Sequence, residues 1–209
     1  MRHPMMILAF SLVLLASFVT SAGHSQETDS HVVWIGLANG LEAEAIMAAE
    51  LRALLRTHEV EPWILTKKIL IDKKQIPHSH PILTIHTRHI GEELELLSTF
   101  VHEQLHWLED EPWLPAFQAA MAEYEKLFPT VPSSADGGAR DNQSTYRHLL
   151  ICDMELQAMT TLVGRTAARE ILSQTTHYEW IYDKVLNDPR VREVALKNGF
   201  NVSNGVPSR

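Results

Sequence analysis

Apolar residues recur at helical spacing along most of the chain. Residues 41–57, "LEAEAIMAAELRALLRT", are rich in alanine and acidic at the start, and they repeat leucine, isoleucine and methionine every three or four positions. Residues 92–108 follow the same rule, with an apolar stripe made of Leu94, Leu97, Val101, Leu105 and Leu108. Both segments are therefore predicted to be helices, and Pro112 ends the second.

The C-terminal half predicts further helices. One runs from Pro115 to about Phe128, and a longer one runs from a cap at Ser144 or Thr145 to Gly164. A short helix is expected over residues 166–173. The run "THYE" (176–179) fits a capping box that opens another helix, and Asp188-Pro189 begins a last helix that Gly199 closes.

Three stretches instead favour extended structure. Residues 31–37 are a weak strand candidate, and residues 62–72 and 82–86 are rich in β-branched and aromatic residues. A proline-containing loop joins the last two, which predicts an antiparallel pair. Because no regular alternation of strands and helices is visible, we expect an α+β, helix-rich fold with a small antiparallel sheet.

The first 22 residues differ from the rest. A short basic start is followed by the uncharged apolar run "MMILAFSLVLLASFV" and then by small residues, which is the pattern of a secretory signal peptide. The run is shorter than the ~20 residues of a membrane-spanning helix. We therefore expect residues 1–22 to be cleaved, residues 23–209 to form a single domain without stable membrane insertion, and the protein to be periplasmic or secreted.

The net charge limits the classes of binding partner, and the cysteine content limits the possible disulfides. The formal net charge of the 209-residue chain is −8, and cleavage would also remove Arg2. An acidic chain without a basic cluster argues against nucleic acid as a partner. The single cysteine, Cys152, permits no internal disulfide and is expected to be a small buried residue.

The motif H-E-x-x-H occurs once, as His102, Glu103 and His106, inside the second predicted helix. Four residues on a helix place the two imidazoles on one face, a single turn apart, where both can bind one zinc ion. Glu103 flanks that face and can take a proton from water. The spacing thus matches the needs of a zinc hydrolase.

A third ligand must come from elsewhere. Glu155 is favoured because it lies in an apolar helix, where an unpaired carboxylate would be costly. An ion pair with Arg147 or Arg165 is the structural alternative for it. His148, two turns earlier on nearly the same face, is a second candidate ligand. Asp110 is a third, although it belongs to a charged helix end.

"HEQLH" with a downstream glutamate resembles the gluzincin branch of zinc metallopeptidases. Residues 62–187 are also similar to a set of small bacterial proteins, through "IPHSHPILTIHTRH", "TFVHEQLHW", "STYRHLLICDMELQAM" and "HYEWIYDKVL". The resemblance implies a zincin-like fold with an active-site helix and a Zn²⁺ ion bound by His102, His106 and Glu155. It also implies a peptide or protein substrate, hydrolysed by zinc-bound water that Glu103 activates.

The same resemblance requires a donor for the oxyanion. His177 and Tyr178 are the candidates, at the first turn of the helix that the capping box opens, and Tyr146 is a weaker third. A histidine cluster, His78, His80, His86 and His89, is interpreted either as cleft-rim or accessory metal ligands or as solvated loop residues. Two other functions stay open: a zinc hydrolase of a non-peptide amide, and a non-catalytic periplasmic zinc-binding protein.

Overall fold

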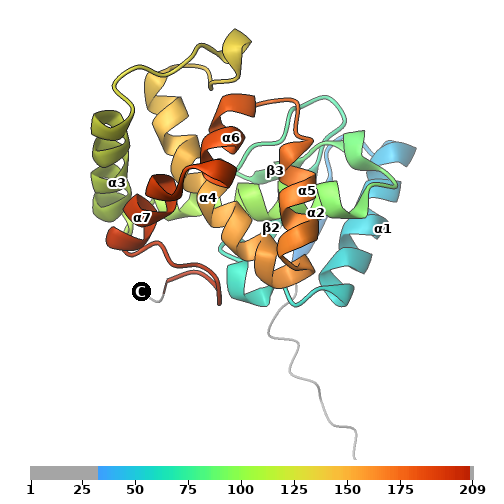
Figure 1. Cartoon of the computed structure of the whole chain (residues 1–209). Coiled ribbons are helices and arrows are strands. Elements are labelled where there is room, and N and C mark those ends of the chain that lie inside the picture. Colours follow the sequence, from blue (N-terminus) through green and yellow to red (C-terminus); the bar gives the residue numbers. More distant parts are fainter. Residues whose placement is uncertain (1–32, 208–209) are drawn as a thin grey trace, which may run out of the picture. The chain divides into compact units, whose positions relative to one another are not determined.

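The computed structural model describes residues 33–207, which form a mixed helix and sheet structure (Figure 1). The predicted signal peptide, residues 1–22, lies outside the described residues. Within the described part there are seven α-helices and one three-stranded sheet. The expected combination of many helices with a small sheet is therefore confirmed.

The sheet is parallel, and the prediction of an antiparallel sheet is wrong. Its strands are β1 (Trp34–Leu37), β2 (Lys68–Ile71) and β3 (Leu83–Ile85), in that spatial order, and both neighbouring pairs are parallel. Helix α1 (Glu42–Thr57) connects β1 to β2 and allows them to run in the same direction. The strand predicted over residues 31–37 is thus the first strand of a strand–helix–strand unit.

The loop between β2 and β3 explains the error in direction. It first returns along the outer edge of β3, where His78 and Thr84 form an antiparallel bridge with backbone N···O distances of 3.2 and 2.7 Å. The chain then turns at Pro81 and enters β3 parallel to β2. Antiparallel pairing is therefore present, but it joins β3 to the loop and not to the preceding strand.

The remaining helices follow the predicted order. They are α2 (Glu93–Leu105), α3 (Leu114–Leu127), α4 (Asn142–Val163), α5 (Arg165–Ser173), α6 (Glu179–Asn187) and α7 (Pro189–Lys197). A 3₁₀ turn, η3 (His106–Glu109), continues α2, and another, η2 (Thr87–His89), follows β3. Helix α4 packs against α2, α3, α5, α6 and α7, and so lies at the centre of the helical part (Figure 1).

Helix α2 connects the sheet to this helical part. Its apolar face is buried and consists of Leu96, Leu97, Phe100, Val101 and Leu105. Burying each such side chain contributes about 2 kcal/mol. Gln104, which is fully buried, accepts hydrogen bonds from the backbone N–H groups of Leu65 and Thr66 and donates one to the Thr66 carbonyl, at 2.8–2.9 Å. The motif helix is therefore anchored to the segment that enters β2.

Two predicted helix starts are corrected. Helix α4 begins earlier than expected because Asp141, not Ser144 or Thr145, accepts the capping bond, from Ser144 N at 2.7 Å. Helix α6 begins at Glu179 rather than after a cap at Thr176. Its Trp180 N–H donates to the carbonyl of Gly137 at 3.1 Å, so a distant loop replaces the capping side chain.

No helix in the part of the chain from residue 33 to residue 207 has both the length and the apolar character needed to cross a membrane.

Candidate metal centre

Helix α2 presents a polar stripe to a large cavity. The stripe is made of Glu95, Ser98, Thr99, His102, Glu103 and His106, which repeat at three- and four-residue intervals. The cavity has a volume of about 1090 Å³, and its other sides are lined by α4, by the segment between α5 and α6, by the loop between β2 and β3, and by η2. The H-E-x-x-H motif thus lies in the wall of a cleft that can hold several residues of a peptide.

Three histidines meet at this wall. The Nε2 atoms of His102 and His106 are 3.3 Å apart, and the ring of His148, from α4, lies 5.7 and 5.2 Å from theirs between centroids. One nitrogen of each ring lies within 4.8 Å of one nitrogen of each of the others. Two nitrogens bound to a tetrahedral zinc at 2.0–2.1 Å are about 3.4 Å apart, so the observed spacing fits zinc.

Each of these rings is held through its other nitrogen. Nδ1 of His102 donates to Glu155 at 2.9 Å, Nδ1 of His106 lies against the Glu109 carboxylate, and Nδ1 of His148 donates to the Ser144 carbonyl at 2.7 Å. Carboxylates and carbonyls accept only, so each Nδ1 carries the hydrogen. The Nε2 atom of each ring therefore faces away from these acceptors and can bind a metal once it carries no proton, and the acceptors keep the rings in place.

Burial also favours the neutral form of two of these ligands. It lowers the pKa of His106 and of His148 well below the usual value, and the positive charge of His102 adds to the effect. Burial acts in the same direction on His102, but the neighbouring Glu155 carboxylate outweighs it and raises the pKa of that imidazole well above the usual value. Proton loss from His102 would therefore accompany metal binding.

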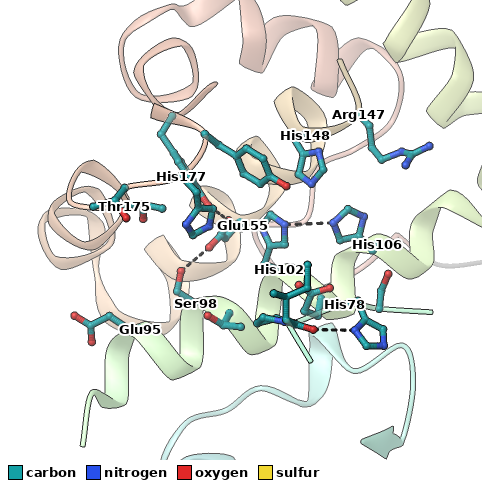
Figure 2. A pocket seen from close by; sticks show the side chains of 18 of the residues that line it. His78, Glu95, Ser98, His102, His106, Arg147, His148, Glu155, Thr175 and His177 are labelled. Carbon is teal, nitrogen blue, oxygen red and sulfur yellow. Dashed lines mark hydrogen bonds and ion pairs between the residues drawn. The ribbon is translucent and has the colours of Figure 1, made fainter. Parts of the chain in front are cut away.

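Glu155 lies behind His102, as Figure 2 shows. Its Oε2 accepts from Nδ1 of His102 and from the Tyr182 hydroxyl, both at 2.9 Å, and its Oε1 accepts from the Ser98 hydroxyl. These bonds satisfy a carboxylate that is only 1% exposed. The predicted ligand set His102, His106 and Glu155 does not come together, because Glu155 faces Nδ1 of His102 whereas His106 faces Nε2.

The alternatives for Glu155 are also resolved. Its partner is His102 and neither Arg147 nor Arg165, since Arg147 forms an ion pair of 2.8 Å with Glu109. Cys152 is fully buried, as predicted, and its Sγ joins His102 and Glu155 in a second group with metal-ligand spacing. Within that group, Glu155 already accepts a hydrogen bond from Nδ1 of His102.

Glu103 lies in the cleft wall beside the three histidines. Its side chain is buried, and within residues 33–207 it forms no hydrogen bond or ion pair. Burial raises the pKa of this carboxyl group, although the neighbouring His102 opposes the shift. A carboxylate of this kind is available to accept a proton from a molecule in the cleft.

His177 and Tyr178 both line the cavity. They precede α6 instead of forming its first turn, and Tyr178 adopts a left-handed conformation with φ of 59°. The Tyr178 ring packs on His148 at 4.4 Å, and the His177 side chain points towards Glu155 and His102 (Figure 2). Tyr146 is excluded as an oxyanion donor, because its buried hydroxyl donates to the Phe128 carbonyl at 2.9 Å and it does not line the cavity.

The histidine cluster lies mostly at the rim of the cleft. His78, His80 and His89 line the cavity, whereas His86 accepts a bond from Arg88 N and caps η2. His80 stacks on Trp107 and bonds to Asp110 at 3.1 Å. Among the described residues, none of the cluster belongs to a group with metal-ligand spacing. Asp110 is likewise outside both groups.

Several site residues were not predicted. Glu109 and Ser98 lie three residues after His106 and four before His102, so helical spacing places them beside the motif. Tyr182, on α6, interrupts an apolar face with a hydroxyl group that needs a partner. Comparison with known proteins adds no further constraint, because no protein-family model, no curated protein and no solved structure matches the chain.

Proposed function

We propose that the protein is an exported, zinc-dependent metallopeptidase in which His102, His106 and His148 bind Zn²⁺ and Glu103 is the general base. The observation that carries the proposal is the convergence of three neutralisable histidines on one point of a cleft wall, next to a carboxylate without a partner. Zinc in such a site supplies Lewis acidity, which activates water and polarises a carbonyl group.

The other catalytic roles fall to side chains and backbone groups of the protein. Glu103 accepts the proton of the attacking water and passes it to the leaving amine. His177 donates a hydrogen bond to the oxyanion, since it lines the same cavity and forms no hydrogen bond within residues 33–207. Glu155, Glu109 and the Ser144 carbonyl orient the three histidine rings.

The group of three histidines, His102, His106 and His148, is open to the cavity on one side, and this favours an enzyme over a zinc carrier. Within residues 33–207 the group contains three donors, and the cavity of about 1090 Å³ adjoins them. Three protein ligands and an accessible position are typical of catalytic zinc sites, whereas storage and structural sites are closed by a fourth ligand. A carrier also has no use for a buried carboxylate beside the ligands.

A peptide substrate agrees with the size of the cleft and with the resemblance of the motif to gluzincins. Helix α2 packs on β3 as an active-site helix would, but the parallel sheet differs from the antiparallel sheet we expected. A zincin-like fold for the whole domain therefore stays a prediction.

The test is hydrolysis of a proteome-derived peptide library by the zinc-loaded protein, with products identified by mass spectrometry. Glu103→Gln is expected to bind one zinc per chain and to lose activity by about 10²–10⁴-fold. Glu125→Gln, on the exposed face of α3, is the matched control. Full activity of Glu103→Gln would refute the mechanism. Cleavage of small acylated amides alone would favour a non-peptide amide hydrolase.

A further inference from the structure

The polar stripe of α2 contains one charged residue that the metal centre does not use. Ser98 donates to Glu155, and His102, Glu103 and His106 have the roles described above. Glu95 lies on the same face, two turns before His102, and lines the same cavity. The stripe therefore extends the cleft beyond the metal centre and ends in a carboxylate.

Glu95 has no partner in the described part of the chain. It is half-buried and forms no hydrogen bond or ion pair there. None of the three arginines that line the cavity forms an ion pair with Glu95 within residues 33–207: Arg147 pairs with Glu109, Arg140 pairs with Asp141, and Arg88 donates through its Nε to the His89 ring. A carboxylate in the cavity wall without a counterion of its own can form an ion pair with a cation that enters the cavity.

The wall around Glu95 suits a long cationic side chain. Figure 2 places Glu95 at the end of the cavity where Thr175 lies, whereas Arg147 and His106 occupy the other end. The segment that contains Thr175 also contributes the apolar Ile171 and the neutral Gln174 to the lining. These two side chains can cover the hydrocarbon part of a lysine or arginine while the charged group reaches the carboxylate.

The length of α2 between Glu95 and His102 is comparable to the reach of one basic side chain. Seven residues of α2 separate Glu95 from His102, which corresponds to about 10 Å along the helix. A lysine or arginine places its charge about 6–7 Å from its own Cα, and the contact with a carboxylate adds about 3 Å. The length of a basic residue that flanks the scissile amide therefore agrees with this interval.

We propose that Glu95 forms a specificity subsite for the cationic group of the substrate, and that the enzyme cleaves peptide bonds adjacent to lysine or arginine. This inference rests on the proposed function, because it names the substrate class of the same cleft. Glu95 acts on the choice of substrate and not on the chemical step.

The experiment compares matched peptides, blocked at both ends, that carry lysine, leucine or glutamate at the position flanking the cleaved bond. The zinc-loaded wild type is expected to cleave the lysine peptide with a kcat/KM roughly ten-fold above that of the leucine peptide. Glu95→Gln should remove this preference, and Glu95→Lys should favour the glutamate peptide. Glu125→Gln, outside the cavity, should keep the wild-type preference.

The outcomes separate the two proposals. If the wild type cleaves peptides without a preference for the basic residue, or if Glu95→Gln keeps that preference, the subsite is refuted and the peptidase is not. If no peptide is cleaved, the proposed function fails and the subsite fails with it. A second series of the same peptides with free amino termini tests whether the enzyme recognises the terminal ammonium group. A preference found only in that series would overturn the assignment to a side chain.

Discussion

Glu155 and His148 lie on opposite sides of His102. Glu155 binds Nδ1 of that imidazole at 2.9 Å, whereas Nε2 belongs to the group that His106 and His148 complete. Both residues come from α4, seven positions apart. One helix therefore supplies a candidate metal ligand and the acceptor that orients a second candidate ligand on the partner helix.

Replacement of His148 should affect zinc binding far more than replacement of Glu155. Zinc binding by such sites is worth about 10–16 kcal/mol, so the loss of one of three ligands should weaken it by about a thousand-fold. Loss of an orienting carboxylate typically costs about 10–100-fold. We expect this order for His148→Ala and Glu155→Gln, measured by competition with a chromophoric chelator. The reverse order would restore Glu155 as the third ligand.

His177 should contribute to the rate and little to zinc or substrate binding. Burial, together with the charge of His102, lowers the pKa of His177 to about 4, so the ring is neutral at pH 7 and can donate from one nitrogen. For His177→Phe we expect kcat to fall about 10²-fold with one zinc retained and KM little changed. His58→Phe, outside the cavity, is the control. A rise in KM at unchanged kcat would instead make His177 a substrate contact.

The helices were predictable because their apolar faces are local patterns. The predicted segment 41–57 and the observed α1 differ by one residue, as do the prediction and observation for α5, and α3 is shifted by one residue at each end. Strand direction was not predictable, since alternation marks a strand without marking its partner. The start of α6 depends on Gly137, more than 40 residues away, which a local capping pattern cannot include.

The candidate site was likewise predictable only as far as local sequence patterns determine it. His102, Glu103 and His106 follow from helical spacing alone. His148 and Glu155 are two turns apart on nearly the same face of α4, so periodicity cannot decide which of them reaches the metal. The packing of α4 on α2 decides it, and this packing is a tertiary property. Glu109 was not among the candidates, although its position three residues after His106 places it within reach.

Gln104 should matter for stability and little for zinc affinity. Its side chain points away from the cleft and forms three hydrogen bonds with the backbone of Leu65 and Thr66. Gln104→Leu would leave these partly buried backbone groups without partners, so we expect the free energy of unfolding to fall by about 3 kcal/mol. Urea denaturation measures the loss, and Gln118→Leu on the exposed face of α3 is the control. Equal stability of the two variants would contradict the anchoring role.

Glu44 should make stability depend on pH in the acid range. Burial raises the pKa of this carboxyl group, but bonds from Asn39, Lys73 and Leu41 outweigh it and hold the pKa at about 2. The ionised form therefore stabilises the fold above pH 4.5, and the contribution is lost as pH falls towards 2. Relative to wild type, with zinc removed from both, Glu44→Gln should lose about 2 kcal/mol at pH 7. Urea midpoints should converge below pH 4.5, while the exposed Glu42→Gln follows wild type throughout. If the difference in urea midpoint between wild type and Glu44→Gln stays constant down to pH 2.5, Glu44 stabilises the fold through its shape and not through its charge.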